Sequence, residues 1–319
     1  MITIVIPYFQ RQAGVLRRAL GSIAVQRECH LPLHVVIVDD TSPVAASAEL
    51  EGFELPNATI EVVLQPNGGP GSTRNAGLNR LAPATRYVAF LDSDDEWSDD
   101  HLARAAIALD SGFDFYLADH YQIDQTVGAF SRAGRIRPAG HPPIAGATGL
   151  HAYLSDMFDQ ILNGNVIGTS TVVYRPEGFS DLRFRSDLTS AGEDYLFWMS
   201  LSLAGARIAF SNQIETTCGR GVNVFAGARW ASDEFFVRIR NEIKFRKMVE
   251  ELFDTSDNQR RQLRKGVKEL RRSFDMSILQ RLRQRKKLPS ALIREHWNLD
   301  SLSFATIPSA AARAVFVRP

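Results

Sequence analysis

Short runs of β-branched and other apolar residues alternate with segments of helical length along the first hundred residues of this chain. The apolar runs are Ile2–Ile6, Val35–Val38, Ile60–Leu64 and Tyr87–Leu91, and the segments between them are 14–26, 43–50 and 72–81. Continuous apolar strands are typical of a parallel sheet that helices cover on both faces. The alternation therefore predicts an open α/β sheet, in which ligands bind beyond the carboxyl ends of the strands.

Polar residues follow the predicted strands, at the edge where function is expected. The strands lead into Pro7-Tyr8, Asp39-Asp40, the segment 65–75 and Asp92-Ser93-Asp94-Asp95. Ser98 then predicts the N-cap of a helix that reaches Leu109, because acids in the first turn favour a helix start. Later strands are expected at Asp114–Ala118, Thr169–Tyr174 and Ile208–Phe210. The Gly-, Pro- and Ala-rich stretch 128–149 is expected to form an irregular loop over the site.

The net charge of +1 conceals two halves of opposite sign. Residues 1–228 contain 16 Arg, no Lys and 25 acidic residues, whereas residues 229–290 contain 18 basic and 9 acidic residues. The basic segment from Ser232 to Gln284 is almost free of Gly and Pro, and a break near 254–257 predicts two helices. From Pro289 onward no pattern is clear.

Apolar residues recur at helical spacing in the basic segment, so that one helix face is apolar and the other is basic. They are Leu263, Val267, Leu270, Phe274, Ile278 and Leu282. Such a helix either packs on the rest of the protein with its charged face in water or contacts an anionic membrane through residues 255–290. No nucleic-acid-binding module accompanies the basic charge, so we do not expect a nucleic-acid partner.

Several protein classes are excluded by composition and by the start of the chain. Cys29 and Cys218 are the only cysteines, which excludes a disulfide framework and a four-thiolate zinc site. No apolar run approaches the roughly 20 residues of a membrane-spanning helix. The first residues lack a basic region and pass straight into a strand, unlike a signal peptide. We therefore expect a cytoplasmic protein.

The cluster Asp92-x-Asp94-Asp95 places several carboxylates at one strand end. Like charges at such short range raise one another's pKa and destabilise the fold unless a cation neutralises them. Mn²⁺ or Mg²⁺ prefers one or two carboxylates together with phosphate oxygens. A solvated acidic turn is the simpler alternative, but the position directly after a buried strand favours a site for a metal–diphosphate.

Three further features belong to the same edge of the sheet. Asp40 is placed to receive a base N–H or ribose hydroxyls, although Asp is also a common turn residue. Gly68, Gly69 and Gly71 allow close approach of the backbone to a phosphate, without the spacing of a P-loop or of a dinucleotide-binding fingerprint. Arg74 is a candidate contact for a diphosphate or a base.

A second acidic pair, Glu193-Asp194, opens a strongly apolar segment far downstream. Two carboxylates at a helix start complement the helix dipole. Alternatively, one of them is a general base that takes a proton from a hydroxyl group.

The order of these motifs resembles the inverting nucleotide-sugar glycosyltransferases of family 2, which have the GT-A fold. The resemblance covers roughly residues 1–205 and is carried by the segments 2–9, 35–42, 68–75, 90–97 and 192–197. The segment Gly219–Gly227 and the basic tail more narrowly resemble bacterial exopolysaccharide glucosyltransferases of the succinoglycan type. By this resemblance the chain has an α/β GT-A fold, an open mixed sheet flanked by helices, with a C-terminal helical extension.

The resemblance also implies roles for individual residues. Pro7, Tyr8 and Asp40 are expected to contact uridine, and Asp194 is expected to be the catalytic base with Glu193 supporting it. The remaining expected donor contacts are Gly71, Arg74, Asp92, Ser93 and Arg220, and the expected metal ligands for Mn²⁺ or Mg²⁺ are Asp94 and Asp95.

This chain departs from the family pattern at two places. Thr73 replaces the usual Ala before Arg74-Asn75. The segment after the base carries Arg220 and Asn223 where many relatives have a His, so His-assisted metal binding is not expected.

The implied activity is transfer of a sugar, glucose being expected, from a UDP-sugar to a saccharide or lipid-linked saccharide during exopolysaccharide or surface polysaccharide assembly. The expected domains are a catalytic domain over 1–228, with a nucleotide-binding half 1–110 and an acceptor-binding half 111–228, and an extension over 229–319. A homo-oligomer is possible, as is peripheral location at the inner face of the plasma membrane. The alternatives are a sugar nucleotidyltransferase and a non-catalytic sugar-nucleotide-binding or scaffold protein.

Overall fold

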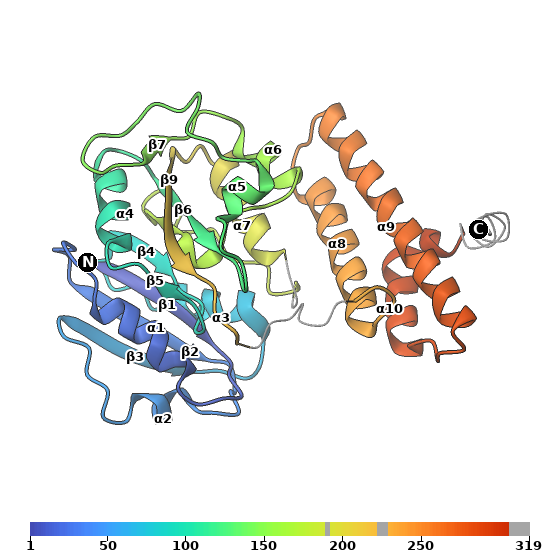
Figure 1. The fold of residues 1–319 in the computed structure, drawn as a ribbon, viewed down its shortest axis with the longest axis horizontal. Coiled ribbons are helices and arrows are strands. Elements are labelled where there is room, and N and C mark those ends of the chain that lie inside the picture. Colours follow the sequence, from blue (N-terminus) through green and yellow to red (C-terminus); the bar gives the residue numbers. More distant parts are fainter. Residues whose placement is uncertain (189–191, 222–228, 306–319) are drawn as a thin grey trace. The chain divides into compact units, whose positions relative to one another are not determined.

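The computed structural model describes residues 1–188, 192–221 and 229–305. The chain divides into two compact units, one of Met1–Thr189 with Glu193–Val222 and the other of Ser190–Gly192 with Asn223–Pro319 (Figure 1). The domain boundaries expected at 110/111 and 228/229 stay predictions.

A nine-stranded sheet forms the centre of the first unit in the described part of the chain, in the order β3-β2-β1-β4-β8-β6-β9-β5, with β7 paired to β9. The strands are β1 (Ile2–Tyr8), β2 (Leu33–Asp39), β3 (Ala58–Leu64), β4 (Tyr87–Phe90), β5 (Glu96–Trp97), β6 (Phe115–Tyr121), β7 (Leu150–Ala152), β8 (Val173–Tyr174) and β9 (Ile208–Thr217). The strands β3, β2, β1 and β4 are parallel, whereas β8 is antiparallel to both β4 and β6. The predicted mixed, open α/β sheet is therefore confirmed.

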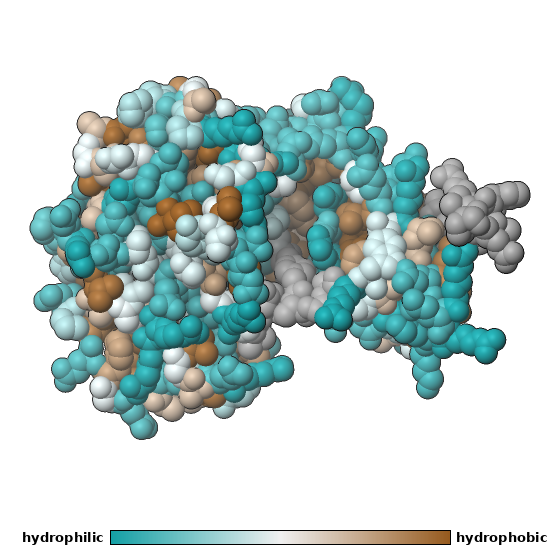
Figure 2. Space-filling model, viewed as in Figure 1, coloured by the Kyte–Doolittle hydropathy of each residue, from teal (hydrophilic) through white to brown (hydrophobic). Residues whose placement is uncertain are grey.

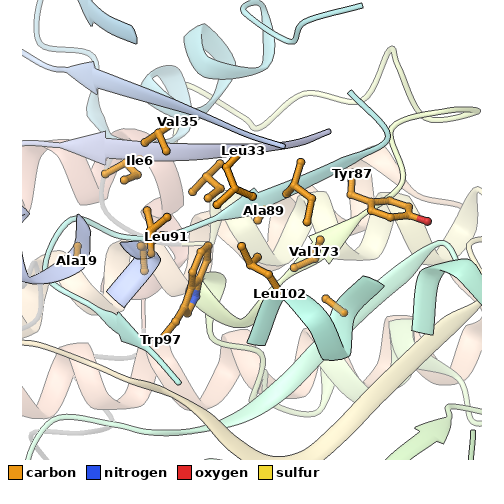
Figure 3. Close-up of a cluster of buried hydrophobic side chains, with 14 of the residues drawn as sticks. Ile6, Ala19, Leu33, Val35, Tyr87, Ala89, Leu91, Trp97, Leu102 and Val173 are labelled. Atoms are coloured by element: carbon orange, nitrogen blue, oxygen red, sulfur yellow. The ribbon is translucent and has the colours of Figure 1, made fainter. Parts of the chain in front are cut away.

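Helices cover both faces of this sheet, as the continuous apolar strands require. They are α1 (Val15–Ala24), α2 (Ala46–Leu50), α3 (Gly69–Leu78), α4 (His101–Asp110), α5 (Ala129–Ala133), α6 (Met157–Leu162) and α7 (Glu193–Leu203). Even-numbered β1 residues such as Ile6 pack with Leu33, Ala19 and Leu102 (Figure 3). On the opposite face Val5 lies so close to α3 that a Cβ on Gly77 would come within 2.3 Å of its side chain.

Stacked aromatic rings fix α7 against the strands. The rings of Phe184 and Phe197 are 4.2 Å apart, and Trp198 stacks on Phe115 of β6 at 5.5 Å. All four side chains are buried. This packing holds the start of α7, with its acidic pair, at the sheet.

Some predicted elements differ from the structure. Helix α4 begins at His101 with Asp100 as its N-cap residue, so the prediction of Ser98 as the cap is wrong; the Ser98 hydroxyl instead donates to Asp100. The predicted strand 169–174 is a 3-10 turn, η1 (Thr169–Thr171), followed by the two-residue β8. The predicted irregular loop 128–149 contains the short helix α5. In the hydroxyl-rich segment 169–171, local hydrogen bonds such as that from the Thr171 hydroxyl to the Gly168 carbonyl compete with strand pairing.

The second unit is helical, with α8 (Asp233–Leu252), α9 (Asp257–Arg283), α10 (Ser290–Asp300) and the 3-10 turn η2 (Ser301–Phe304). The predicted break is confirmed, and Ser256 starts α9 through a capping box with Gln259. Sequence patterning missed α10. In the described ranges, no helix has the length and apolar composition needed to cross a membrane.

Candidate active site

Arg74 joins the end of β4 to the start of α7. Its guanidinium donates to Asp92 Oδ1 at 2.7 Å and to Glu193 Oε1 at 2.9 Å. Arg74 and Glu193 are each only 4% exposed. Burial alone would lower the pKa of Arg74, but the charges of Asp92, Glu193 and Asp194 outweigh it and raise that pKa. Three residues that the sequence singled out separately are thus brought together as one buried charge cluster.

Gly71 permits this cluster by allowing α3 and α7 to approach closely. A Cβ at Gly71 would lie 3.0 Å from the carbonyl oxygen of Arg185 and 3.3 Å from Cγ of Glu193. In the structure Gly71 is part of α3 itself rather than of a loop before it. Its position therefore accounts for close helix packing, and the predicted phosphate contact stays a prediction.

Asp194 lies beside this cluster at the start of α7. Its carboxylate accepts hydrogen bonds from the Thr169 hydroxyl at 3.2 Å and from the Tyr195 amide at 2.9 Å. Burial and the charge of Glu193 raise the pKa of Asp194 to about 7, against the opposing effect of Arg74. A carboxylate with this pKa is a stronger base than an exposed one and is about half ionised at pH 7.

The carboxylates of Asp94 and Asp95 lie against the segment that follows β9. Gly221 donates its amide to Asp94 Oδ2 at 2.7 Å, and Gly219 donates to Asp95 Oδ1 at 2.9 Å. Burial and the charge of Asp92 raise the pKa of Asp94 to about 6 and raise that of Asp95 as well. These raised pKa values show that negative charge is held here at a cost in free energy.

The three carboxylates are not equally suited to a divalent cation. Both Asp95 oxygens are engaged, since Oδ2 accepts from the Ser170 hydroxyl at 2.6 Å, and the side chain is buried. Asp92 keeps a third of its side chain exposed. No group of three or more His, Cys, Asp or Glu side chains gathers for a metal within the described ranges. The Asp95 carboxylate is therefore held by hydrogen bonds within the protein, and the expected roles of Asp94 and Asp95 as metal ligands stay predictions.

The residues expected to contact the nucleotide also make contacts within the protein. Asp40 accepts from the amides of Gly68 at 2.8 Å and Gly69 at 2.9 Å, so it holds the start of α3. Tyr8 is 1% exposed, and burial together with the charge of Glu49 raises its pKa to about 12. Pro7 is half-buried. The expected uridine contacts of these residues stay predictions.

Arg220 is not brought to the buried cluster. Its side chain is 74% exposed and pairs with Asp124. Asn223, the other departure from the family pattern, lies outside the described residues. The predicted donor contacts of Arg74 and Arg220 stay predictions, and that of Arg220 would require its side chain to leave Asp124.

The sequence reading missed Ser170 because it assigned this residue to a strand. The Ser170 hydroxyl accepts from the Asp92 amide at 2.9 Å and donates to Asp95, and its carbonyl accepts from the Trp97 indole at 2.5 Å. The hydroxyl run Thr169-Ser170-Thr171 before an apolar pair was the available signal. The turn η1 thereby holds both ends of the segment 92–97, which we call the acidic loop. Through Thr169 it also holds the acidic pair of α7.

Gln10 was missed as well. It donates to the Ser93 hydroxyl at 3.0 Å, and its backbone amide donates to the Ser42 hydroxyl at 2.7 Å. Ser93 is buried by this contact. Gln10 therefore links the ends of β1, β2 and β4.

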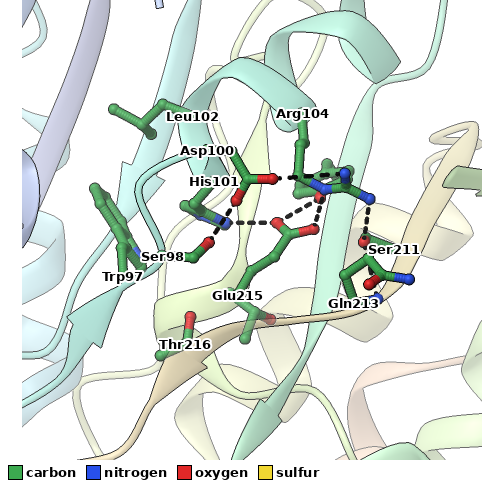
Figure 4. A network of polar contacts seen from close by, with 12 residues as sticks. Trp97, Ser98, Asp100, His101, Leu102, Arg104, Ser211, Gln213, Glu215 and Thr216 are labelled. Carbon is green, nitrogen blue, oxygen red and sulfur yellow. Dashed lines mark hydrogen bonds and ion pairs between the residues drawn. The ribbon is translucent and has the colours of Figure 1, made fainter. Parts of the chain in front are cut away.

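A second polar network joins α4, the helix that follows the acidic loop in the sequence, to β9 (Figure 4). Glu215 of β9 lies between His101 Nδ1 at 2.9 Å and Arg104 Nε at 2.6 Å, and it also accepts from the Tyr116 hydroxyl at 2.6 Å. All four residues are buried. The buried carboxylate is thus paired and hydrogen-bonded, which a charge in the interior requires, and it fixes α4 to the strand that precedes Gly219.

We expect Gly219→Ala to weaken nucleotide binding while the protein stays folded. A Cβ at Gly219 would lie 1.6 Å from the carbonyl oxygen of Asp94, so the segment must move and the amide bond to Asp95 is lost. The measurement is Mn²⁺-dependent UDP binding by calorimetry. Gly21→Ala in α1 is the control, because nothing lies within 4 Å of its Cβ. Unchanged UDP binding by Gly219→Ala would contradict the placement of this segment.

Comparisons with known proteins agree with this architecture. The model of the family "Glycosyl transferase family 2" matches residues 3–175. The chain is 33% identical over 232 residues to "Succinoglycan biosynthesis protein ExoW" of Rhizobium meliloti (strain 1021), covering 70% of each chain. It is 29% identical over 184 residues to "Putative teichuronic acid biosynthesis glycosyltransferase TuaG" of Bacillus subtilis (strain 168), covering 57% of this chain and 65% of that protein.

Among solved structures, S. aureus TarS 1–349 superposes with a TM-score of 0.55 at 18% identity, covering 98% of this chain and 91% of that one. The same protein in complex with UDP-GlcNAc gives a TM-score of 0.55, covering 92% of that chain. This likeness shows the GT-A fold. The family match spans the acidic loop and Arg74, and together with the relative at 33% identity it identifies the chain as an enzyme, a glycosyltransferase of family 2.

Proposed function

We propose that this enzyme transfers a sugar, with glucose as the expected one, from a UDP-sugar to a hydroxyl of a saccharide or lipid-linked saccharide, with inversion at the anomeric carbon. The observation that carries the proposal is the buried bridge from Asp92 through Arg74 to Glu193, beside Asp194 with its raised pKa. The printed names of the relatives, in succinoglycan and teichuronic acid biosynthesis, support a role in exopolysaccharide or surface polysaccharide assembly. The UDP-GlcNAc complex of TarS supports a UDP-sugar donor.

Asp194 is the proposed general base. Its carboxylate takes the proton of the acceptor hydroxyl while the hydroxyl oxygen forms a bond to the anomeric carbon. The bond from that carbon to the diphosphate oxygen breaks on the opposite face, and UDP leaves with its electron pair. An α-linked donor therefore yields a β-glycoside. The hydrogen bond from Thr169 orients the carboxylate for this proton transfer.

Arg74 and Glu193 position the reacting groups. Glu193 is occupied by Arg74 and buried, so it orients the start of α7 and leaves Asp194 as the carboxylate for the acceptor. Arg74 brings positive charge to the loop in which the expected diphosphate contacts lie. Preorganised charge of this kind stabilises negative charge that develops in the transition state.

Asp94, together with Asp92, is the proposed holder of Mn²⁺ or Mg²⁺. A bound cation supplies Lewis-acid neutralisation of the diphosphate. The raised pKa of Asp94 reflects the burial and like charge that a cation would relieve.

The experiment that tests the proposed function is a donor screen. The purified full chain is incubated with UDP-glucose, UDP-galactose and UDP-GlcNAc, with Mn²⁺, Mg²⁺ or EDTA, and UDP release is measured with and without acceptor extracts. We expect one UDP-sugar to be turned over, with UDP-glucose the fastest. Absence of UDP release from every donor, in a chain that is folded, would overturn the proposal.

We expect Asp94→Ala to abolish metal-dependent UDP binding. The substitution removes one of two carboxylates that remain available to a cation, and a site with one carboxylate fewer loses affinity. Calorimetry with UDP in Mn²⁺ and in EDTA measures the difference. Asp99→Ala, an exposed acid whose partner is Arg27, serves as the control. A titration of Asp94→Ala that matches the parent would rule out Asp94 as a metal ligand.

A further inference from the structure

Helix α9 has an apolar face that the fold already uses. Leu263, Val267, Phe274 and Ile278 are buried, and the last three pack against Phe236, Ile239 and Ile243 of α8. Only Leu282, at the end of the expected apolar stripe, is largely exposed, at 54%. The apolar face is consumed by the helical unit, so α9 is not a free amphipathic helix whose apolar side could enter a bilayer.

Apart from Arg283, the cations of α9 fall into two groups of four. One group is paired with acids, and its pairs are Arg260–Asp257, Arg264–Glu250, Arg271–Asp300 and Arg281–Asp233. These pairs tie α9 to itself, to α8 and to α10. Their charges are therefore used within the unit.

The other group forms a stripe along the exposed side of the helix. Arg261, Lys265, Lys268 and Arg272 are all exposed, and none has an acid partner among the described residues. Their spacing of four, three and four residues places them on one helix face, about 16 Å long. We call these four residues the basic stripe. The side chains at the upper edge of the second unit, where α9 begins, are hydrophilic (Figure 2).

The surroundings of the basic stripe keep its charge uncompensated. Two exposed acids lie beside it on α9: Asp257, which is paired with Arg260, and Glu269. Arg285, Lys286 and Lys287 add three exposed cations just after the helix. Met276, one turn beyond Arg272 on the same face, is 40% exposed. A row of cations that ends in an exposed apolar side chain suits an interface between lipid headgroups and acyl chains. It lacks the aromatic side chains on which nucleic-acid bases stack.

We propose that the basic stripe binds the surface of a bilayer that contains anionic lipids. The contact is electrostatic, runs along the side of α9 and leaves the apolar core of the helical unit intact. Clusters of four or more Lys and Arg near a membrane attract anionic lipid in this way, and the attraction is screened by salt. The contact would hold the enzyme where lipid-linked acceptors lie, a consequence that rests on the proposed function.

The experiment uses the full chain and needs no enzyme activity, so its outcome is independent of the proposed sugar transfer. Vesicles of phosphatidylcholine, with and without roughly 30% phosphatidylglycerol, are sedimented with the protein at low and high salt. The test variant carries Arg261→Gln, Lys265→Gln, Lys268→Gln and Arg272→Gln. The control variant loses the same charge from exposed positions of the first unit, through Arg11→Gln, Arg17→Gln, Arg27→Gln and Arg80→Gln.

We expect the parent and the control to bind the anionic vesicles and to be released by salt, whereas the test variant binds at least about tenfold more weakly. Thermal unfolding followed by circular dichroism verifies that the test variant is folded. Equal binding by the test variant, or an equal loss in the control, would overturn the assignment of the stripe. Binding of an acidic polysaccharide or of DNA through the stripe, without binding of anionic vesicles, would overturn the lipid surface as its partner.

Discussion

Replacing Asp194 with Asn is expected to lower the rate of sugar transfer by about 10²–10⁴-fold while UDP binding stays unchanged. The amide occupies the same volume but cannot take the proton of the acceptor hydroxyl, and Asp194, on α7, is not one of the carboxylates proposed for the cation. The measurement is initial-rate UDP release with saturating donor and acceptor, together with UDP calorimetry. Asp181→Asn, an exposed acid of the same unit, is the control. Turnover near that of the parent would rule out Asp194 as the base.

The pH dependence provides a second readout for the same residue. Burial and the charge of Glu193 raise the pKa of Asp194 to about 7, so the active carboxylate form is lost as the pH falls below that value. We expect kcat/KM of the parent to fall on this acidic side and the residual rate of Asp194→Asn to lack this limb.

The same shift has a consequence for stability. Because the folded-state pKa lies above the usual carboxyl value, the folded chain binds the extra proton, and stability at this residue falls as the pH rises toward about 7. A neutral amide removes that cost. The Asn variant should therefore unfold at a temperature no lower than the parent at pH 8, which separates loss of catalysis from loss of fold.

Replacing Arg74 with Met is expected to destabilise the first unit by about 3–5 kcal/mol. Glu193 is 4% exposed, and its recorded cationic partner is Arg74, so the substitution leaves a buried carboxylate without compensation. Asp92 loses its ion pair too, and the acidic loop is no longer tied to α7. Thermal unfolding followed by circular dichroism measures the loss. Sugar transfer is expected to fall with it because Asp194 loses its fixed position.

A second substitution distinguishes charge from packing. Glu193→Gln added to Arg74→Met removes the uncompensated charge, so part of the lost stability should return. Arg80→Met is the control, since Arg80 is half-exposed and contacts Glu61 at 3.6 Å, and exposed pairs of this kind contribute at most about 1 kcal/mol. If Arg74→Met unfolds at the parent temperature, the buried bridge does not hold the site together.

The fold was predicted well where buried strands give continuous runs of apolar residues in the sequence. The four parallel strands β1 to β4 were located to within a few residues. In β1, β2 and β4 most positions are buried and apolar, which is typical of strands covered on both faces. The edge strand β3 is only partly buried and was located by its β-branched residues. The antiparallel strand β8 was poorly predicted, since it has only two residues and follows a hydroxyl-rich turn. Helix α10 was missed because its buried residues, His296 and Asp300, are polar, so that burial leaves no apolar stripe in its sequence.

The candidate site was predicted as separate motifs rather than as an arrangement. Sequence motifs identified Asp92, Asp94, Arg74 and the pair Glu193-Asp194, but spacing along the chain carries no information about contacts across 119 residues. The engagement of Asp95 by Ser170 and Gly219 was equally invisible. The sequence does not distinguish an Asp that is available to a cation from one whose oxygens accept hydrogen bonds within the protein. Only the hydrogen-bond partners in the structure do so.

Periodicity, strand ends and composition are local properties of the sequence. They were enough to predict the sheet, the edge at which the site is expected, the family resemblance and the opposite charges of the two halves. Which charges pair with one another depends on the folded structure. In the structure Arg74 pairs with two acids from distant elements, and Arg220 pairs with Asp124. Four cations of α9 form ion pairs, and four others form the basic stripe. Pairing depends on distance in space, which the order of residues along the chain does not fix.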